Sequence, residues 1–204
     1  MRCRSILPVA LCLGAAACGI LDPRPDPTRW FVLATVQELD PTRKEAEHVG
    51  ETLGLGPLTF PDYAMGRELV SRQGPTSLAP SPNERWAEPL DEAIARVLAS
   101  DLEFVTGARS RPYPWFATDA PGARVRIRVE RFELEQRARA VLVATWSLEN
   151  GNGDVLQERR FSAARELADP GGASAAVELS RCLVDLSKDI AGAWRNAVGK
   201  GTAR

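Results

Sequence analysis

The strongest constraint on the fold is a stripe of apolar residues near the end of the chain. Within residues 173–198 it recurs in steps of four, three, four and three, through Leu179, Leu183, Leu186, Ile190 and Ala193. This spacing matches the 3.6-residue turn of an α-helix, and so predicts one long amphipathic helix. Such a helix is stable in water only when another layer of structure covers its apolar face.

Three segments directly before this helix are typical of β-strands. Residues 124–134 alternate, with Val125, Ile127 and Val129 on one face and arginines on the other, as a half-buried strand requires. Residues 138–149 are apolar on both faces, which predicts a central strand, and residues 153–167 complete the meander. The sequence Asn-Gly-Asn-Gly-Asp at 150–154 is typical of a hairpin turn.

The first half of the chain contains weaker signals for the same kinds of element. Aromatic and β-branched residues predict a strand over 29–36, and further strands are expected over 51–60 and 67–72, with a turn at 61–66. A helix is expected from about Trp86 to Leu102, with Pro89 in its first turn. Residues 37–50 and 108–122 are expected to form loops because they are polar or rich in proline.

These elements predict an α+β fold in the order β-β-β-α-β-β-β-α, after a cleaved leader. Two main helices packed on one face of a mixed, largely antiparallel sheet would bury both apolar helix faces. The expected organisation is a single domain over 30–198, followed by a flexible tail at 199–204.

The first twenty residues contain three of the four cysteines, and they predict a secretory leader. A short positive start precedes an uncharged, mostly apolar run from Ile6 to Ala17, which is too short to span a bilayer. The alternative, an uncut anchor helix, is opposed by the prolines that follow at once. Three alanines before Cys18 resemble the lipobox of bacterial lipoproteins, whereas Cys12 follows the bulky Leu11 and Cys3 has no apolar run before it.

The lipobox resemblance implies a signal peptide at 1–17 and a diacylglycerol on the sulfur of Cys18. Several acyl chains are needed for durable anchoring, because one chain holds only marginally. Residues 18–29 would then be the lipidated cysteine and an extended, proline-rich tether. Because Gly19 rather than aspartate follows the cysteine, the resemblance implies the periplasmic face of the bacterial outer membrane.

The sequence provides no candidate catalytic residue, metal site or cofactor motif. The single histidine, His48, lies in a polar segment, so a hydrolase that uses it is the least favoured hypothesis. A net charge of −1 gives no indication of nucleic-acid binding. Arginines at 124–139 could form a phosphate or lipid-headgroup surface, but a salt-bridged or subunit-contact face is favoured. The last cysteine, Cys182, is expected to pack as a small apolar residue.

Aromatic side chains gather in the sequence Tyr-Pro-Trp-Phe at 113–116. Exposed aromatics mark contact sites on many proteins, so Tyr113, Trp115 and Phe116 are candidate partner contacts. Packing of the same side chains into the core is the alternative.

Residues 53–102 contain three short motifs: the turn Pro61-Asp62-Tyr63, the segment Leu69-Val70-Ser71-Arg72, and a helix-opening segment from Trp86 to Leu90. Through these motifs the segment resembles the ABC-type transport auxiliary lipoproteins, the PqiC/YmbA-like family. Of the motif residues, Pro61, Asp62, Tyr63, Trp86, Pro89 and Leu90 are candidate partner contacts.

The resemblance implies a non-catalytic adaptor that needs no cofactor. Its expected partners are a protein with mammalian-cell-entry (MCE) domains and an ABC permease and ATPase that move phospholipid between membranes. A homo-oligomeric ring is a further expectation. The alternative function is that of a structural lipoprotein in outer-membrane assembly, serving lipopolysaccharide or protein insertion.

Overall fold

The fold is an open sheet of eight strands with two long helices, seen in a computed structural model that describes residues 25–116, 118 and 120–201. The first three strands are β1 (Arg29–Phe31), β2 (Thr52–Thr59) and β3 (Glu68–Gly74). A fourth strand, β4 (Ser77–Trp86), leads into α2 (Leu90–Thr106). The remaining elements are β5 (Arg109–Pro112), β6 (Ala123–Glu135), β7 (Arg139–Asn150), β8 (Val155–Glu166) and α3 (Gly172–Gly201).

The long strand β6 organises the sheet. Along one side it pairs with β7, which pairs in turn with β8, and both pairings are antiparallel. On its other side its first half pairs with β2 and its last residues pair with β3, both in parallel. From β3 the sheet continues to β4 and β1, and from β2 it continues to β5. The sheet is therefore mixed, with the longest pairings antiparallel, as the sequence predicts.

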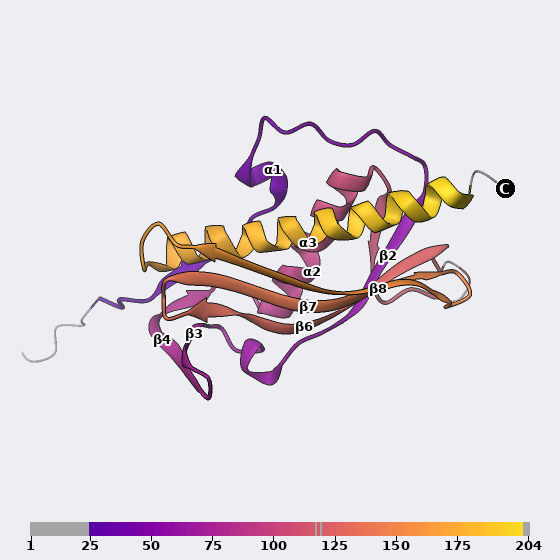
Figure 1. The fold of residues 1–204 in the computed structure, drawn as a ribbon. Coiled ribbons are helices and arrows are strands. Elements are labelled where there is room, and N and C mark those ends of the chain that lie inside the picture. The colour runs from indigo at the N-terminus through magenta and orange to yellow at the C-terminus, as the bar shows by residue number, and fades with distance from the viewer. Residues whose placement is uncertain (1–24, 117, 119, 202–204) are drawn as a thin grey trace, which may run out of the picture.

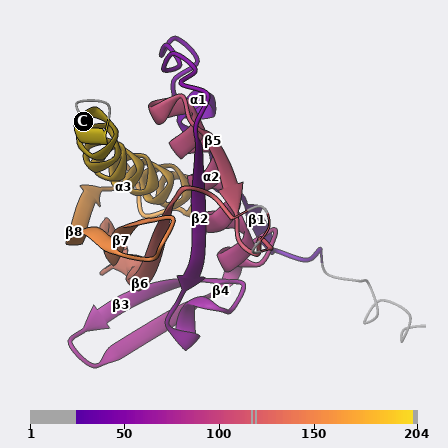
Figure 2. The same cartoon turned by 90° about the vertical axis from the view of Figure 1, so that its right-hand side faces the viewer.

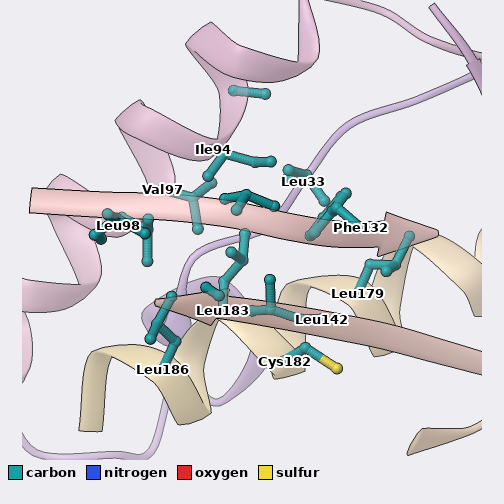
Figure 3. Close-up of a cluster of buried hydrophobic side chains, with 14 of the residues drawn as sticks. Leu33, Ile94, Val97, Leu98, Phe132, Leu142, Leu179, Cys182, Leu183 and Leu186 are labelled. Carbon is teal, nitrogen blue, oxygen red and sulfur yellow. The ribbon is translucent and has the colours of Figure 1, made fainter. Parts of the chain in front are cut away.

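The core lies between this sheet and the two long helices. Inward residues of β6 and β7, including Phe132 and Leu142, meet Leu179 and Leu183 from the predicted stripe of α3, as Figure 3 shows. Cys182 is fully buried in the same cluster, and burial raises the pKa of its thiol to about 12. The expectation that Cys182 packs as an apolar residue is confirmed.

Several predicted boundaries were wrong. The first strand ends at Phe31 rather than Val36, because a capping box between Thr35 and Glu38 starts the short helix α1 (Val36–Leu39). Trp86 ends strand β4, so α2 begins at Leu90. Two strands were also missed, β4 and β5, the second within the expected loop at 108–122.

The short helix α1, the turn η2 (Asp62–Ala64) and the β3–β4 hairpin lie outside the layer formed by α2 and α3. Figure 1 shows α3 lying along the sheet, with α1 and the chain after it beyond the helices. The turn η2 lies on the other side of the sheet, and Figure 2 shows the β3–β4 hairpin at the end opposite α1. The predicted turn at 61–66 and the hairpin turn after Asn150 are both present.

Candidate functional site

The proline-rich segment enters the folded body at Arg29, beside a buried carboxylate. Glu84, on β4, has a side chain that is only 4% exposed. Its two oxygens accept hydrogen bonds from Arg29 Nη2 at 2.6 Å, Arg137 Nη2 at 2.5 Å, Ser81 Oγ at 3.0 Å and the backbone N–H of Gly172 at 2.9 Å. Burial works against ionisation, but the donors outweigh it, led by Arg137, and hold the pKa of Glu84 below its usual value.

These bonds join four segments that are distant in the sequence. Arg137 reaches Glu84 from the β6–β7 turn, where its φ is 55°, a left-handed conformation unfavourable for a residue with a side chain. Its backbone N–H also donates to Ser71 Oγ on β3, at 3.1 Å. Gly172, at the start of α3, packs so closely on the ring of Phe31 that a Cβ would lie 2.3 Å from it. The start of the folded body is therefore locked to β3, β4, the β6–β7 turn and α3.

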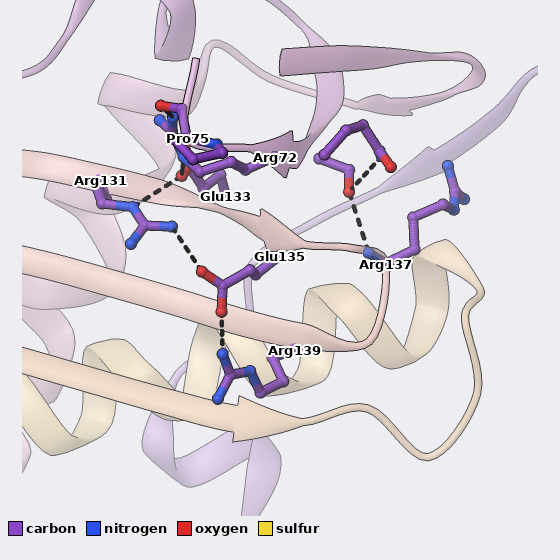
Figure 4. Close-up of polar contacts among 9 residues, drawn as sticks. Arg72, Pro75, Arg131, Glu133, Glu135, Arg137 and Arg139 are labelled. Carbon is purple, nitrogen blue, oxygen red and sulfur yellow. Dashed lines mark hydrogen bonds and ion pairs between the residues drawn. The ribbon is translucent and has the colours of Figure 1, made fainter. Parts of the chain in front are cut away.

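A second group of charges lies beside that turn, along β3, β6 and β7 (Figure 4). Glu133, whose side chain is fully buried, accepts from Arg72 Nε at 2.5 Å and from Arg131 Nε at 2.8 Å. Glu135 forms ion pairs with both Arg131 and Arg139. The three arginines also line a cavity of about 780 Å³, and Glu135 and Glu166 line it too. The positive and negative side chains that line this cavity largely cancel, so the electrostatic potential inside it is weak.

The arginines at 124–139 were a candidate headgroup surface, and the structure shows them paired. Arg124 and Arg126 lie 3.2 Å and 2.9 Å from the carboxylate of Glu149. Glu130 accepts from Arg160 at 2.9 Å. Glu133, Glu84 and Glu135 pair with Arg131, Arg137 and Arg139, whereas Arg128 has a single long contact of 4.0 Å to Glu130. The salt-bridged interpretation therefore holds for most of this face.

The predicted motif around the Pro-Asp-Tyr turn has a structural explanation. Pro61 precedes η2, Asp62 is exposed, and Tyr63 is half buried. Burial, followed by the neighbouring carboxylate of Glu133, raises the pKa of Tyr63 to about 12. The turn therefore places the ring of Tyr63 beside the ionic group of β6.

The second part of the motif builds the core. Trp86 is 2% exposed, and its ring lies 6.5 Å from that of Phe132. Pro89 is the N-cap residue of α2, and Leu90, its first residue, is buried. A partner can reach the exposed Asp62 directly, whereas Trp86 and Leu90 act by positioning β4 and α2.

The predicted aromatic contact residues follow β5. Phe116 is 80% exposed and Tyr113 is 55% exposed. Trp115 is partly covered; its ring meets that of Tyr113 edge-on, with centroids 5.2 Å apart, and approaches Gly54 of β2. The loop therefore combines the two alternatives: Trp115 fastens it to the sheet, and its neighbours remain on the surface.

Residues that sequence reasoning associated with chemistry are dispersed. His48 is exposed in the segment after α1. Among the described residues, no three His, Cys, Asp or Glu side chains are grouped so that they could hold a metal ion. Over the same residues, no helix is both long and apolar enough to cross a membrane. The predicted lipidation site, Cys18, lies outside the described residues.

Sequence reasoning missed Glu84, a buried carboxylate that accepts four hydrogen bonds. It lies in the polar stretch Pro-Asn-Glu-Arg, between two residues that are also charged or polar. Apart from Ser81, its partners are 55, 53 and 88 residues away, so no local pattern marks it.

A comparison with known protein families shows to which family this chain belongs. Residues 31–191 match the model of the ABC-type transport auxiliary lipoprotein component. The chain belongs to this family. The match covers every strand of the sheet except the first two residues of β1, together with α2 and two thirds of α3. No curated protein matches the chain significantly.

Solved structures agree on the fold. An uncharacterized protein is 18% identical with a TM-score of 0.66, and the alignment covers 80% of this chain and 96% of that one. A protein of Xanthomonas campestris, of the family termed DUF330, is 15% identical with a TM-score of 0.67, over 86% and 99%. The PelC dodecamer from Paraburkholderia phytofirmans is 13% identical over 70% and 93%, and its TM-score of 0.39 is too low for any argument about assembly.

Proposed function

We propose that this auxiliary lipoprotein is a non-catalytic adaptor of an MCE-type ABC system for phospholipid transport, held at the periplasmic face of the outer membrane. The observation that carries the proposal is the family match over residues 31–191. In this proposal residues 1–17 are removed, Cys18 carries the lipid, residues 18–29 are the tether and residues 30–198 are one domain.

The way the chain enters the fold supports an anchored adaptor. Arg29, at the end of the proposed tether, bonds to Glu84, which also holds the first turn of α3. A pull on the tether would therefore act on a point that hydrogen bonds join to β4, the β6–β7 turn and α3. An adaptor needs such an attachment, because its folded body has to keep a defined position between membrane and partner.

The aromatic loop supports a partner contact. Large apolar side chains that stay exposed on a monomer mark interaction surfaces, and Phe116 and Tyr113 do so from a loop that Trp115 fixes to β2. A loop whose backbone is fastened in this way loses less conformational entropy on binding, which favours its use as an interface anchor. We assign the partner contact to this loop, with Asp62 as a further candidate.

The experiment is site-specific photo-cross-linking in intact cells. A photoreactive amino acid at Phe116 should cross-link to an MCE-domain protein or to its permease. The matched control places the same amino acid at Val177, which is exposed on α3, and should give no such product. Detergent-solubilised membranes should yield the same partners on affinity purification.

Two outcomes would contradict the proposal. Equal cross-linking from Val177 would remove the role of the loop, and recovery of no MCE protein or permease would remove the transport assignment. Recovery of proteins that assemble the outer membrane would instead establish the structural alternative. The lipid anchor is tested separately: Cys18→Ala should abolish lipid labelling, whereas Cys12→Ala should leave it unchanged.

A further inference from the structure

A small cavity on the helix side of the molecule has four cationic side chains and no carboxylate in its lining. It has a volume of about 140 Å³ and lies between the chain after α1, the end of α2 and the C-terminal half of α3. Figure 1 shows the chain after α1 running beyond α3 before it turns into β2. Four cations line it: Arg43, Lys44, Lys188 and Arg195. We call this site the cationic cavity.

The cations of the cationic cavity form few ion pairs, although Asp40 and Asp101 lie close enough to Arg43 for their charges to interact, and Asp101 also interacts with Lys188. Among the residues that the structure describes, no carboxylate lies within ion-pair distance of Arg43, Lys44 or Arg195, and Arg195 donates only to the carbonyl of Val105, at 3.3 Å. Lys188 has a long contact of 3.4 Å to Asp185. Four cations held around one hollow repel one another, and an anion between them would relieve that repulsion.

The remaining wall of the cavity is apolar and rigid. Phe104 and Val105 of α2 and Ala191 of α3 form it, and Phe104 belongs to a small buried cluster with Val36 and Val184. An apolar wall lowers the local dielectric and strengthens the attraction between the cations and an anion. The backbone of the covering segment is also fixed, because the Ala46 N–H donates to the Phe104 carbonyl at 2.9 Å.

A second hollow of about 360 Å³ adjoins the cationic cavity and shares Arg43 and Lys188 with it. Its own arginines are already paired: Arg165 with Asp185 at 2.6 Å, and Arg181 with Glu178 at 2.5 Å. Its other carboxylate, Asp40, accepts from the Thr42 hydroxyl at 2.6 Å. The free positive charge is thus concentrated in the smaller cavity, and the larger one leaves room for the rest of a ligand.

We propose that the cationic cavity binds a phosphate group. Two guanidinium and two ammonium groups offer donors from several directions, which suits the tetrahedral, multiply charged oxygens of phosphate better than a planar carboxylate. The group can belong to free phosphate or to the headgroup of an anionic lipid. This site is distinct from the arginines at 124–139, most of which form ion pairs, and it does not depend on the identity of the transport partner.

The test is a titration of the full-length, lipid-anchored chain in non-ionic detergent. The probes are inorganic phosphate, pyrophosphate and short-chain phosphatidic acid, with short-chain phosphatidylcholine as the net-neutral control. We expect saturable binding that weakens with salt, and roughly tenfold or greater loss of affinity in Arg43→Gln/Arg195→Gln. The matched control, Arg109→Gln/Arg128→Gln, removes the same net charge from exposed strand positions and should change the affinity less than about twofold.

Each outcome has a defined meaning. Tighter binding of phosphatidic acid than of phosphate or pyrophosphate identifies a lipid headgroup, and the reverse identifies a free phosphate. The proposal is overturned if no phosphate probe binds saturably up to about 10 mM, or if the two double variants lose affinity equally. Thermal unfolding of both variants checks that they fold, and Lys44→Gln/Lys188→Gln provides a second, independent pair.

Discussion

The charged side chains near the two ends of helix α3 differ in how completely they are paired. At its start, beside Arg29, the buried Glu84 is bonded by two arginines, a hydroxyl and a backbone N–H. Towards its other end, Lys188 and Arg195 join Arg43 and Lys44 around a cavity without a lining carboxylate. Lys188 and Arg195 follow Gly172 by about 16 and 23 residues, which at 1.5 Å per residue is roughly 24–35 Å, or about three to four Debye lengths at physiological salt.

The difference separates charges that hold the fold from charges available to a ligand. A buried carboxylate that is fully bonded stabilises one arrangement of the chain, and its removal leaves its donors without a partner. Exposed cations that converge with few ion-pair partners contribute little to stability and favour the binding of an anion.

The same comparison extends to Asp101, another buried carboxylate. Asp101 of α2 accepts one bond, from the Val36 N–H at 2.7 Å, and its other oxygen has no partner among the described residues.

The largest expected effect is at the first end of α3. Glu84→Gln should lower the free energy of unfolding by about 2–4 kcal/mol, because the amide cannot satisfy both arginines and the Gly172 N–H. Urea unfolding at pH 7.5 measures it. The control, Glu166→Gln, changes a carboxylate that is 76% exposed and should cost less than about 0.5 kcal/mol. A similar small loss for both would mean that the Glu84 contacts do not stabilise the fold.

The pH dependence of Glu84 has a definite sign. Because its pKa in the folded protein is lower than its ordinary value, it contributes stability above that value and loses it as the pH falls through the folded pKa. Glu84→Gln should therefore flatten the fall in stability on acidification below about pH 4.5.

Asp101 should behave in the opposite sense and with a smaller effect. Burial raises its pKa from 3.8 to about 6, so the folded protein loses stability as the pH rises through that window. The difference corresponds to about 3 kcal/mol as an upper bound. We expect Asp101→Asn, which keeps an acceptor for the Val36 N–H, to stabilise the protein by about 1–2 kcal/mol at pH 7.5. Unfolding curves at pH 4 and 7.5 measure it, and a destabilised Asp101→Asn at pH 7.5 would contradict it.

The smallest effects give the most direct test of the comparison. Arg29→Gln removes a partner of Glu84 from a side chain that is 63% exposed, and should cost about 0.5–1 kcal/mol. Arg43→Gln makes the same chemical change at the cationic cavity and should be neutral or stabilising by a few tenths of a kcal/mol, because it relieves repulsion. Thermal unfolding at low and high salt, without phosphate, measures both. Equal destabilisation by Arg29→Gln and Arg43→Gln would contradict the inference that only the first arginine stabilises the fold.

The elements predicted well are those whose burial repeats along the chain. The stripe of α3, the alternation of β6 and the turn after Asn150 were all visible, because local periodicity reports which face is buried. Strands β4 and β5 were missed for the converse reason. β4 contains Pro80 and Pro82 and is largely polar, and β5 has only four residues, so each is held by its neighbours rather than by its own pattern.

By itself, the sequence determined the α+β class, the meander with its covering helix, and the segments that resemble a family of transport auxiliary lipoproteins. The tertiary structure decided which charges meet. Glu84 finds partners more than 50 residues away, Trp86 leaves the predicted helix for the core, and Arg43 and Lys44 come to lie beside Lys188 and Arg195. The physical reason is that periodicity encodes burial locally, whereas ion pairs and cavities depend on strand register and helix packing between distant segments.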